Sequence, residues 1–398
     1  TDRSPGRLTL TLPTSADDDP TLEERERLTA LSTIEPLRVL AQAEVDHPHL
    51  PLEAGAFAFD YLSTFESLPE VAQGANTCPD YLFYDARIIL VVDHPTREAT
   101  LVGASVDTAD LERRMDALAA AIDSIDNAAD VESPASSTDG AASPVLHAVP
   151  TVSDADFEAV VEEMRGYIAD GDVYQVVPSR GFTIACPDAL AAYHVLRHAN
   201  PSPYMFYLAA PDFELFGASP ESALLYSVRS GRVAIRPIAG TRPRGLHPDG
   251  SVDHERDTRL ELELRTDAKE VAEHVMLVDL ARNDVARVSR PGTRSVQDLL
   301  RVDRYSRVMH LVSEISGELA EDLDALDAFR ASMTMGTLTG APKLRAAELI
   351  RQAEGVRRGS YGGSVGYIRG DGELDTCIVI RSGFVSAGTA LVQAGAGV

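Results

Sequence analysis

The sequence lacks the features that mark membrane-spanning, disulfide-rich and zinc-binding chains. None of its apolar runs reaches the roughly 18 residues that a spanning helix needs. Its three cysteines, Cys78, Cys186 and Cys377, are odd in number and far apart, and no Cys-x-x-Cys pair occurs, which argues against a disulfide framework or a zinc site. The opening Thr-Asp-Arg-Ser-Pro is not a signal peptide. These absences fit a protein of the reducing cytoplasm.

Positive charge is also scarce. The chain has 36 basic and 62 acidic residues, for a net charge of −26, and its only lysines are Lys269 and Lys343. Such a chain lacks the basic face that nucleic acids and anionic membranes require, so we expect neither as a partner. Its 398 residues, 44% hydrophobic and 25% charged, are typical of a folded protein with two or three domains, or one large one.

A polar segment divides the chain. Residues 126–146 contain almost no large apolar side chain, and such a stretch cannot offset the entropy lost on ordering. We interpret it as a flexible linker or a long surface insertion between an N-terminal part, 1–125, and a second part, 147–398.

Hydrophobic periodicity outlines the elements on either side. Apolar residues recur three and four apart over 108–123 and from Phe157 to Ile168, where Ser153 starts a capping box and Gly171 ends the helix. Further helices are expected over 267–283 and 342–353, and strands over 81–93, 99–106, 173–180, 206–208, 223–228, 233–237, 363–368, 376–383 and 390–394. Strands grouped apart from helices indicate an α+β fold with large, mostly antiparallel sheets.

Two glutamates stand one turn apart in the helix expected over 267–283. Glu270 and Glu273 would point the same way, and their like charges repel unless something neutralises them. A divalent cation is one solution, because Mg²⁺ takes one or two carboxylates together with substrate oxygens. A solvated acidic turn beside Lys269 and His274 is the other, and Glu-x-x-Glu is too common for spacing alone to favour the metal.

Other candidates are ambiguous when taken singly. Gly240 permits close backbone approach and Thr241 adds a hydroxyl, but their arginine-rich segment could equally be a surface turn. Arg381 stands in an apolar strand, where its charge needs an anionic partner from protein or ligand. His310 lies among apolar neighbours and could be an ordinary core residue, and Glu221 is equally undecided.

Two glycine-containing segments also have open interpretations. The segment 335–343 is a small-residue loop entering a helix, whose exposed amides favour an anion. Glycines at 395 and 397 either turn strand amides toward a ligand or mark a tight corner.

The order of several motifs is more specific than any one of them. They are Pro-Ile-Ala-Gly-Thr-Arg-Pro-Arg at 237–244, Lys-Glu-Val-Ala-Glu-His at 269–274, Leu-Ala-Arg-Asn-Asp at 280–284, Arg-Tyr-Ser-Arg-Val-Met-His at 304–310, Gly-Ala-Pro-Lys at 340–343, Gly-Ser-Tyr-Gly-Gly at 359–363 and Thr-Cys-Ile-Val-Ile-Arg at 376–381. Together they resemble the large subunit (component I) of anthranilate synthase, within the chorismate-utilising enzymes. The resemblance implies large antiparallel sheets packed as a sandwich with flanking helices, with 1–125 as the N-terminal part and 147–398 as the chorismate-binding catalytic region.

The resemblance also implies a two-step reaction on chorismate with Mg²⁺ as cofactor. Ammonia adds at ring carbon two while the 4-hydroxyl leaves, and pyruvate is then eliminated to give anthranilate, the first committed step of tryptophan biosynthesis. Ammonia would come from a separate glutamine amidotransferase subunit, so a hetero-oligomer is expected, with L-tryptophan as feedback inhibitor.

Site residues follow by the same resemblance. Glu273 is similar to a direct metal ligand, Glu270 stands beside it, Glu221 is similar to the general acid for hydroxyl departure, and His310 to the group linked to elimination. The implied substrate contacts are Gly240, Thr241, Thr337, Tyr361, Arg381, Gly395, Ala396 and Gly397. Part of a tryptophan site is implied at Pro203, Tyr204 and Met205.

Two positions favour the anthranilate branch. Aminodeoxychorismate synthases commonly carry lysine where this chain has Ala239, and isochorismate and salicylate synthases typically place a water-activating lysine where it has Gln175. Without either amine, ammonia is the expected nucleophile. The alternatives are an aminodeoxychorismate, aminodeoxyisochorismate or isochorismate synthase, or a catalytically incomplete tryptophan-binding fragment.

The sequence departs from the family's pattern at both ends. The family has an N-terminal Leu-Leu-Glu-Ser element and, beyond the Gly-Ala-Gly-Val at 395–398, an acidic helix with further metal carboxylates; neither is found here. We therefore expect a trimmed chain or a fragment, an incomplete metal shell, and weak or no turnover by the bare chain.

Overall fold

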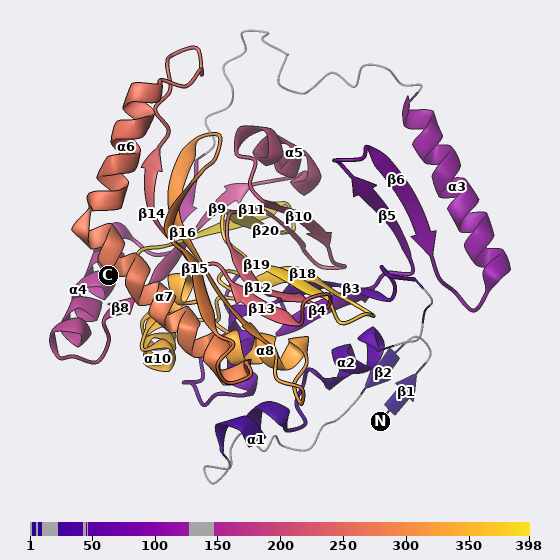
Figure 1. The fold of residues 1–398 in the computed structure, drawn as a ribbon, viewed down its shortest axis with the longest axis horizontal. Coiled ribbons are helices and arrows are strands. Elements are labelled where there is room, and N and C mark those ends of the chain that lie inside the picture. Colours follow the sequence, from indigo (N-terminus) through magenta and orange to yellow (C-terminus); the bar gives the residue numbers. More distant parts are fainter. Residues whose placement is uncertain (1, 5–6, 10–22, 43–44, 46, 127–146) are drawn as a thin grey trace.

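The structure, a computed structural model, describes residues 2–4, 7–9, 23–42, 45, 47–126 and 147–398. The segment interpreted as a linker lies outside these ranges except for residue 126, so that interpretation stays a prediction. The described elements form two large antiparallel sheets with helices around them (Figure 1).

The larger sheet has nine strands. Their order is β14 (Ile238–Pro243), β16 (Val308–Glu318), β13 (Arg232–Ile235), β12 (Ser222–Ser227), β19 (Leu374–Ile378), β18 (Ser364–Arg369), β3 (Leu52–Phe57) and β4 (Tyr81–Asp85), with β15 (Ser295–Arg304) paired to β16. β3 and β18 pair from Phe57 opposite Ser364 to Leu52 opposite Arg369. The division into 1–125 and 147–398 stays a prediction, but strands from both parts share this sheet.

The second sheet has six strands and packs against the first. Their order is β10 (Tyr204–Ala209), β11 (Glu214–Ser219), β20 (Ser382–Ser386), β21 (Thr389–Gly395), β9 (Ser179–Ala185) and β7 (Val149–Pro150). Ala56 of the larger sheet and Leu215 and Phe384 of the smaller one belong to one buried apolar cluster. Burying an apolar face of each sheet against the other is what gives a layered domain its core. The expected α+β sandwich is confirmed.

Helices surround the two sheets (Figure 1). They are α1 (Glu24–Thr29), α2 (Glu35–Ala41), α3 (Thr108–Asp126), α4 (Asp154–Ala169), α5 (Ala189–Ala199), α6 (His254–Thr266), α7 (Ala268–Val288), α8 (Ala325–Ser332), α9 (Gly336–Thr339) and α10 (Lys343–Glu354), with a 3-10 helix at Phe59–Thr64. Val285 of α7 and Phe329 of α8 share the largest core cluster with Leu224 and Ile315 of the nine-stranded sheet. No helix in the described ranges is long and apolar enough to cross a bilayer.

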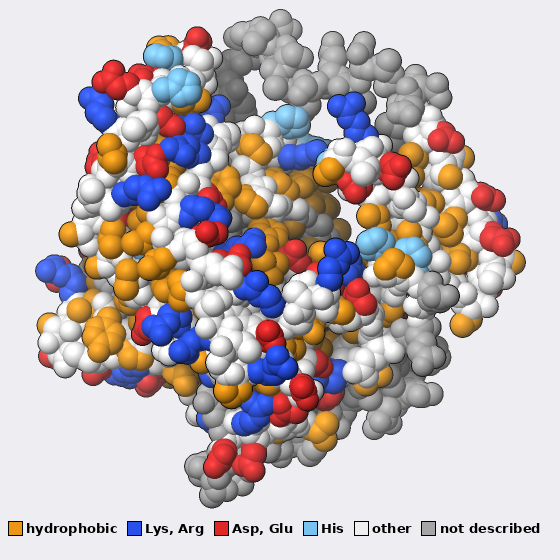
Figure 2. Space-filling model, viewed as in Figure 1, with side chains coloured by type: hydrophobic (Ala, Val, Ile, Leu, Met, Phe, Trp, Pro, Cys, Tyr) orange, Lys and Arg blue, Asp and Glu red, His pale blue; other side chains and the backbone are white. Residues whose placement is uncertain are grey.

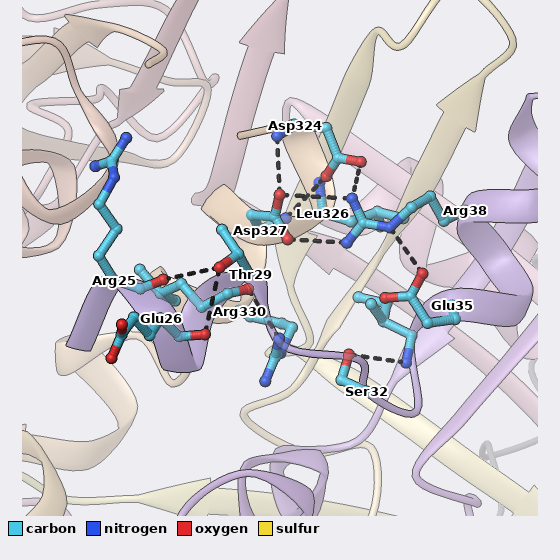
Figure 3. A network of polar contacts seen from close by, with 12 residues as sticks. Arg25, Glu26, Thr29, Ser32, Glu35, Arg38, Asp324, Leu326, Asp327 and Arg330 are labelled. Carbon is cyan, nitrogen blue, oxygen red and sulfur yellow. Dashed lines mark hydrogen bonds and ion pairs between the residues drawn. The ribbon is translucent and has the colours of Figure 1, made fainter. Parts of the chain in front are cut away.

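Ion pairs hold α2 on α8 (Figure 3), and a hydrogen bond from Arg330 of α8 to the Leu28 carbonyl joins α1 to it. The Arg38 guanidinium of α2 binds Asp324 and Asp327 at the start of α8, the latter at 2.8 Å, and Glu35 of its own helix at 3.2 Å. Asp324 and Asp327 also cap α8 by accepting each other's backbone N–H. Charge-assisted hydrogen bonds of this kind are the stronger ones, so the network fixes the N-terminal helices to the main body.

Three strands that were expected to be continuous are divided, and those predictions are wrong. The run 81–93 splits into β4 and β5 (Ile88–Asp93), 173–180 into β8 (Gln175–Val176) and β9, and 376–383 into β19 and β20. At each break the chain leaves one sheet for another: β5 pairs with β6 (Glu98–Gly103), and β8 with β17 (Gly340–Ala341). The expected helices are confirmed, including the Ser153 cap, whose hydroxyl accepts the Asp156 N–H.

Candidate active site

His310 and Thr241 face each other on adjacent strands. Thr241 of β14 lies opposite His310 of β16, with Oγ1 and Nδ1 2.9 Å apart. Burial, and then the Arg381 guanidinium, lowers the pKa of His310 to about 4. Nε2 lies 3.5 Å from Arg381 Nη2, and because a guanidinium has no acceptor, Nε2 presents its lone pair on this side. At neutral pH His310 is therefore a neutral imidazole that can take a proton.

Glu221 lies in the turn between β11 and β12 and is buried. Its Oε1 accepts the Thr337 hydroxyl at 2.8 Å and the Ile238 N–H at 3.3 Å. Burial raises the pKa of Glu221 to about 7, although these bonds and the Arg381 charge favour the ionised form. A carboxyl poised near neutrality can give a proton and then hold the resulting charge.

Arg381 differs from its sequence-based interpretation. It is not inside a strand but between β19 and β20, with a φ of 50°, and it is exposed. In the part of the chain that the structure describes, its guanidinium contacts the His310 imidazole and pairs with no carboxylate within 4.0 Å. The expected anionic partner from the protein is therefore absent from these ranges. An exposed guanidinium beside Glu221 and His310 is a candidate site for an anionic ligand.

The glycine-rich end of β21 lies against Tyr361. Tyr361 is buried, and a Cβ placed on Gly395 would lie only 3.1 Å from its hydroxyl. The Ala396 N–H already donates to the Pro178 carbonyl at 3.0 Å, so that amide is not free for a ligand. Gly395, Ala396 and Gly397 are exposed, which leaves their backbone open to close approach.

Glu270 and Glu273 extend from the start of α7 toward these segments. A Cβ on Gly240, whose φ is 81°, would lie 3.2 Å from Glu270 Oε2, and one on Gly397 would lie 3.8 Å from Glu273 Oε1. The acidic pair therefore stands between the Gly240 turn and the glycine-rich strand end, and both side chains are half-buried. This position favours the metal interpretation over the solvated acidic turn, and the metal site stays a prediction.

Each of these carboxylates already has one neutralising or polar partner. Glu270 pairs with Arg242 Nη1 at 3.0 Å, and Glu273 accepts from Gln175 Nε2 at 2.9 Å. Within the described ranges no three His, Cys, Asp or Glu residues gather around a common point for a metal. Two carboxylates nevertheless fit Mg²⁺, which keeps waters and substrate oxygens. Glu273, whose partner is a neutral amide, fits better than Glu270, whose partner is a guanidinium.

Pro203, Tyr204 and Met205 lie at the start of β10, outside the contacts just described. Pro203 and Tyr204 line a cavity of about 320 Å³ together with Asp375, whereas Met205 is not part of its lining. Burial, and then the Asp375 carboxylate, raises the pKa of the Tyr204 hydroxyl. The cavity is a candidate binding site with a half-buried acidic group, and it adjoins the Glu221 contacts because Pro220, Ser222 and Ile238 also line it.

The comparisons with known proteins identify the family of the chain. A family model for chorismate binding enzymes matches residues 10–398. The chain is 51% identical over 417 residues to anthranilate synthase component 1 of Vibrio cholerae, covering 100% of this chain and 76% of that protein. It is 50% identical over 383 residues to the Escherichia coli K12 protein of that name, covering 95% and 72%. The chain belongs to the anthranilate synthase component 1 family of chorismate-binding enzymes.

Solved structures show the same fold. Anthranilate synthase component I from Streptococcus pneumoniae matches with a TM-score of 0.77 at 29% identity, covering 92% of this chain and 81% of that chain. The menaquinone-specific isochorismate synthase of Escherichia coli matches with a TM-score of 0.67 at 20% identity, covering 92% and 77%. The second likeness concerns the fold alone.

Sequence reasoning about the family missed three polar contacts of the site. Gln175 is a branch marker in the sequence, yet in the structure it binds Glu273. Arg242 is one of several arginines in its segment, yet its guanidinium pairs with Glu270 and also with Asp267, the latter at 2.8 Å. It thereby joins β14 to the start of α7. Asp375 carries no sequence signal except its place beside an apolar run, and none of the described residues forms a hydrogen bond with its buried Oδ1.

Proposed function

We propose that this chain catalyses the formation of anthranilate from chorismate in two steps. Ammonia adds at ring carbon two and the 4-hydroxyl leaves as water; the ring then loses a proton and the enolpyruvyl group leaves as pyruvate. The observation that carries the proposal is the buried Glu221, with a pKa of about 7, beside a guanidinium that has no carboxylate partner among the described residues. A dicarboxylic substrate with a poor leaving group requires both features.

In the first step Glu221 donates its proton to the departing hydroxyl, which leaves as water, and it regains a proton when the ammonium group formed at ring carbon two loses one. The carboxylate that remains is held by the Thr337 hydroxyl and the Ile238 N–H, and by the charge of Arg381. Thr337, which is also an expected substrate contact, thus orients the carboxyl of Glu221 through its hydroxyl.

Ammonia is favoured over water by the chemistry around Gln175. Its side chain offers no base that could activate water, and Ala239 offers no amine. Gln175 Oε1 is buried and has no hydrogen-bond partner among the residues that the structure describes, so it is an acceptor available to an N–H of ammonia. The same amide donates to Glu273 and is thereby oriented.

In the second step His310 accepts the ring proton. Its low pKa keeps the imidazole neutral, and the Thr241 hydroxyl at Nδ1 holds the ring while Nε2 faces the guanidinium side of the site. Arg381, Tyr361 and the exposed backbone of Gly395 and Gly397 would bind and orient the substrate.

Glu273, with Glu270 beside it, would hold Mg²⁺ as the cofactor. When bound, the cation neutralises a substrate carboxylate and the two like charges of the glutamates. Without it, Arg242 and Gln175 keep the two side chains in place.

We also propose that a glutamine amidotransferase subunit supplies the ammonia and that L-tryptophan inhibits from the cavity at Pro203 and Tyr204. The relatives are named component 1, which implies a partner component.

A cytoplasmic location is supported by three buried cysteines, none in a disulfide.

Product identification tests the proposal. Because weak or no turnover is expected of the bare chain, a chain extended past Val398 by the family's acidic helix is mixed with chorismate, Mg²⁺ and an ammonium salt at high pH, and fluorescence and pyruvate are followed. Anthranilate and pyruvate in equal amounts are expected. A non-fluorescent isomer of chorismate, or an aminated product that retains pyruvate, would assign another chorismate-utilising activity. Calorimetry that shows tryptophan binding but no Mg²⁺-dependent chorismate binding would assign a non-catalytic fragment instead.

A further inference from the structure

We propose that Glu354, the last residue of α10, and Arg358, in the turn that follows, are positioning residues of the chorismate site. This inference rests on the proposed function. Neither is among the expected substrate contacts. Arg358 is 2% exposed and is one of the largest fully buried side chains. Its charge is balanced by Glu354, whose side chain is 9% exposed.

The Arg358 guanidinium joins three segments that carry site residues. Nη1 donates to the Leu338 carbonyl at 2.8 Å, next to Thr337, which holds Glu221. Nη2 donates to the Val177 carbonyl at 2.7 Å. The same group stands 5.8 Å from the centre of the Tyr361 ring, within cation–π range.

Glu354 extends this clamp to the strand end that faces the ligand. Its carboxylate accepts hydrogen bonds from Nε and Nη2 of Arg358, the shortest of them at 2.9 and 2.6 Å. Its Oε1 also accepts both the backbone N–H and the hydroxyl of Ser179, at 2.8 and 2.9 Å. Ser179 is the register partner of Gly395 in the pairing of β9 with β21. The ion pair thus fixes the backbone on which Gly395 and Gly397 are displayed.

Stability alone does not account for this ion pair. Removing two charges from water is costly, and an apolar pair of similar volume often stabilises a core as well or better. The planar guanidinium, in contrast, can hold two carbonyls and a carboxylate in one fixed arrangement. Small displacements of groups around a bound substrate are expensive for binding and rate, so a rigid support is useful here.

The test compares three variants of the whole chain. Glu354→Gln keeps the size and one acceptor but removes the charge. Ser179→Ala removes a single hydroxyl bond to the same carboxylate. Arg345→Gln is the matched control, because Arg345 lies on the same helix and pairs with Asp172 and Glu348 in a half-exposed position. Chorismate affinity is measured by calorimetry with Mg²⁺, KM and kcat by anthranilate fluorescence, and folding by thermal unfolding.

We expect Glu354→Gln to weaken chorismate binding and raise KM by about 10-fold, with kcat within about 3-fold and the pH profile unchanged. Ser179→Ala should raise the dissociation constant of chorismate and KM by about 2- to 3-fold, and Arg345→Gln should leave both as in the wild type. A merely structural role would instead lower the melting temperature and the active fraction while KM stays the same.

Two outcomes would overturn the inference separately from the proposed function. A folded Glu354→Gln variant that binds chorismate like the wild type refutes the positioning role. If that variant does not fold, unchanged affinity in Ser179→Ala refutes it. Wild-type chain that does not bind chorismate with Mg²⁺ refutes the proposed function first, and this inference with it.

Discussion

At the scale of single residues, the pKa values of Glu221 and His310 are both shifted toward the neutral form, and for the same reason. Burial disfavours the charged form of each, so the pKa of the acid rises to about 7 and that of the imidazole falls to about 4. The acid keeps a proton to give and the imidazole keeps a lone pair to accept one. When the surroundings shift the pKa values of two groups in opposite directions, one group can serve as the acid and the other as the base.

Glu221→Gln removes the acid but keeps an acceptor for the Thr337 hydroxyl. We expect turnover to fall by about 10²- to 10⁴-fold, the range of a lost general acid, while chorismate affinity stays close to that of the wild type. Anthranilate fluorescence and calorimetry measure the two quantities. Equal losses of affinity and turnover would contradict a role in proton transfer.

The same variant tests the raised pKa through stability. Because the folded-state pKa of Glu221, about 7, lies above the ordinary 4.5, its contribution to stability is complete below about pH 4.5 and is lost as the pH rises through about 7. Glutamine does not ionise. The melting temperature of Glu221→Gln relative to wild type should therefore rise between about pH 5 and pH 8, and a constant difference would contradict the raised pKa.

Arg381→Met separates binding from folding. Arg381 is an exposed residue whose guanidinium pairs with no carboxylate within the described ranges, so its removal should change the free energy of unfolding by less than about 0.5 kcal/mol. Chorismate affinity should fall by at least about 10-fold, since a charge-assisted hydrogen bond contributes about 1.5–3 kcal/mol. Urea unfolding and calorimetry measure these, and intact chorismate binding by the variant would remove Arg381 from the site.

At the scale of elements, apolar runs locate strands but not the sheets to which they belong. The run 376–383 contributes β19 to one sheet and β20 to the other, and Arg381 stands at the crossing between them. This crossing brings the guanidinium beside His310 of β16. A continuous strand would have kept Arg381 within a single sheet.

Two glycines in different packing environments test the close approach of β3 and β18. A Cβ on Gly363, at the start of β18, would lie 2.1 Å from the Phe57 carbonyl of β3, whereas one on Gly166 in α4 would meet nothing within 4 Å. Gly363→Ala should lower the free energy of unfolding by about 1–3 kcal/mol through overpacking. Gly166→Ala should raise it by about 0.5–1 kcal/mol because helical glycine is costly. Urea titrations of both variants check the opposite signs, and equal effects would contradict the close approach of β3 and β18.

At the scale of the whole molecule, residues on both sides of 127–146 build one core. Leu37, Phe57 and Tyr61 share the largest buried cluster with Phe329 and Ile368. Because β3 also supplies the neighbour of β18, the second part by itself would expose both an apolar face and an unpaired strand edge.

Expression of the two parts separately tests this unity. Residues 147–398 alone should aggregate or lose near-ultraviolet circular dichroism, and co-expression with 1–126 should restore a soluble complex that elutes as one species. Cooperative thermal unfolding of 147–398 alone, at the temperature of the whole chain, would show instead that the second part is an independent domain.

Most local structure, and the family, could be predicted from the sequence. The α4 helix begins at its Ser153 cap, and α7 follows the apolar spacing expected over 267–283. Glu221, His310 and Arg381 were candidates by resemblance, while their residue patterns alone left each undecided. The strand breaks, and the contacts of Arg242 and Gln175, were not predicted, because each depends on a partner distant in the chain.

By itself, then, the amino-acid order determined helices, caps and a set of motifs whose combination indicates a chorismate-binding enzyme. Those properties depend on neighbours within a few residues, or on the motifs themselves. Only the tertiary structure decided that Glu221 is buried enough to keep its proton, that His310 is neutral beside Arg381, and that Arg358 and Glu354 support the strand end. The reason is that pKa values and positioning depend on burial and on charges brought together from segments far apart in the chain.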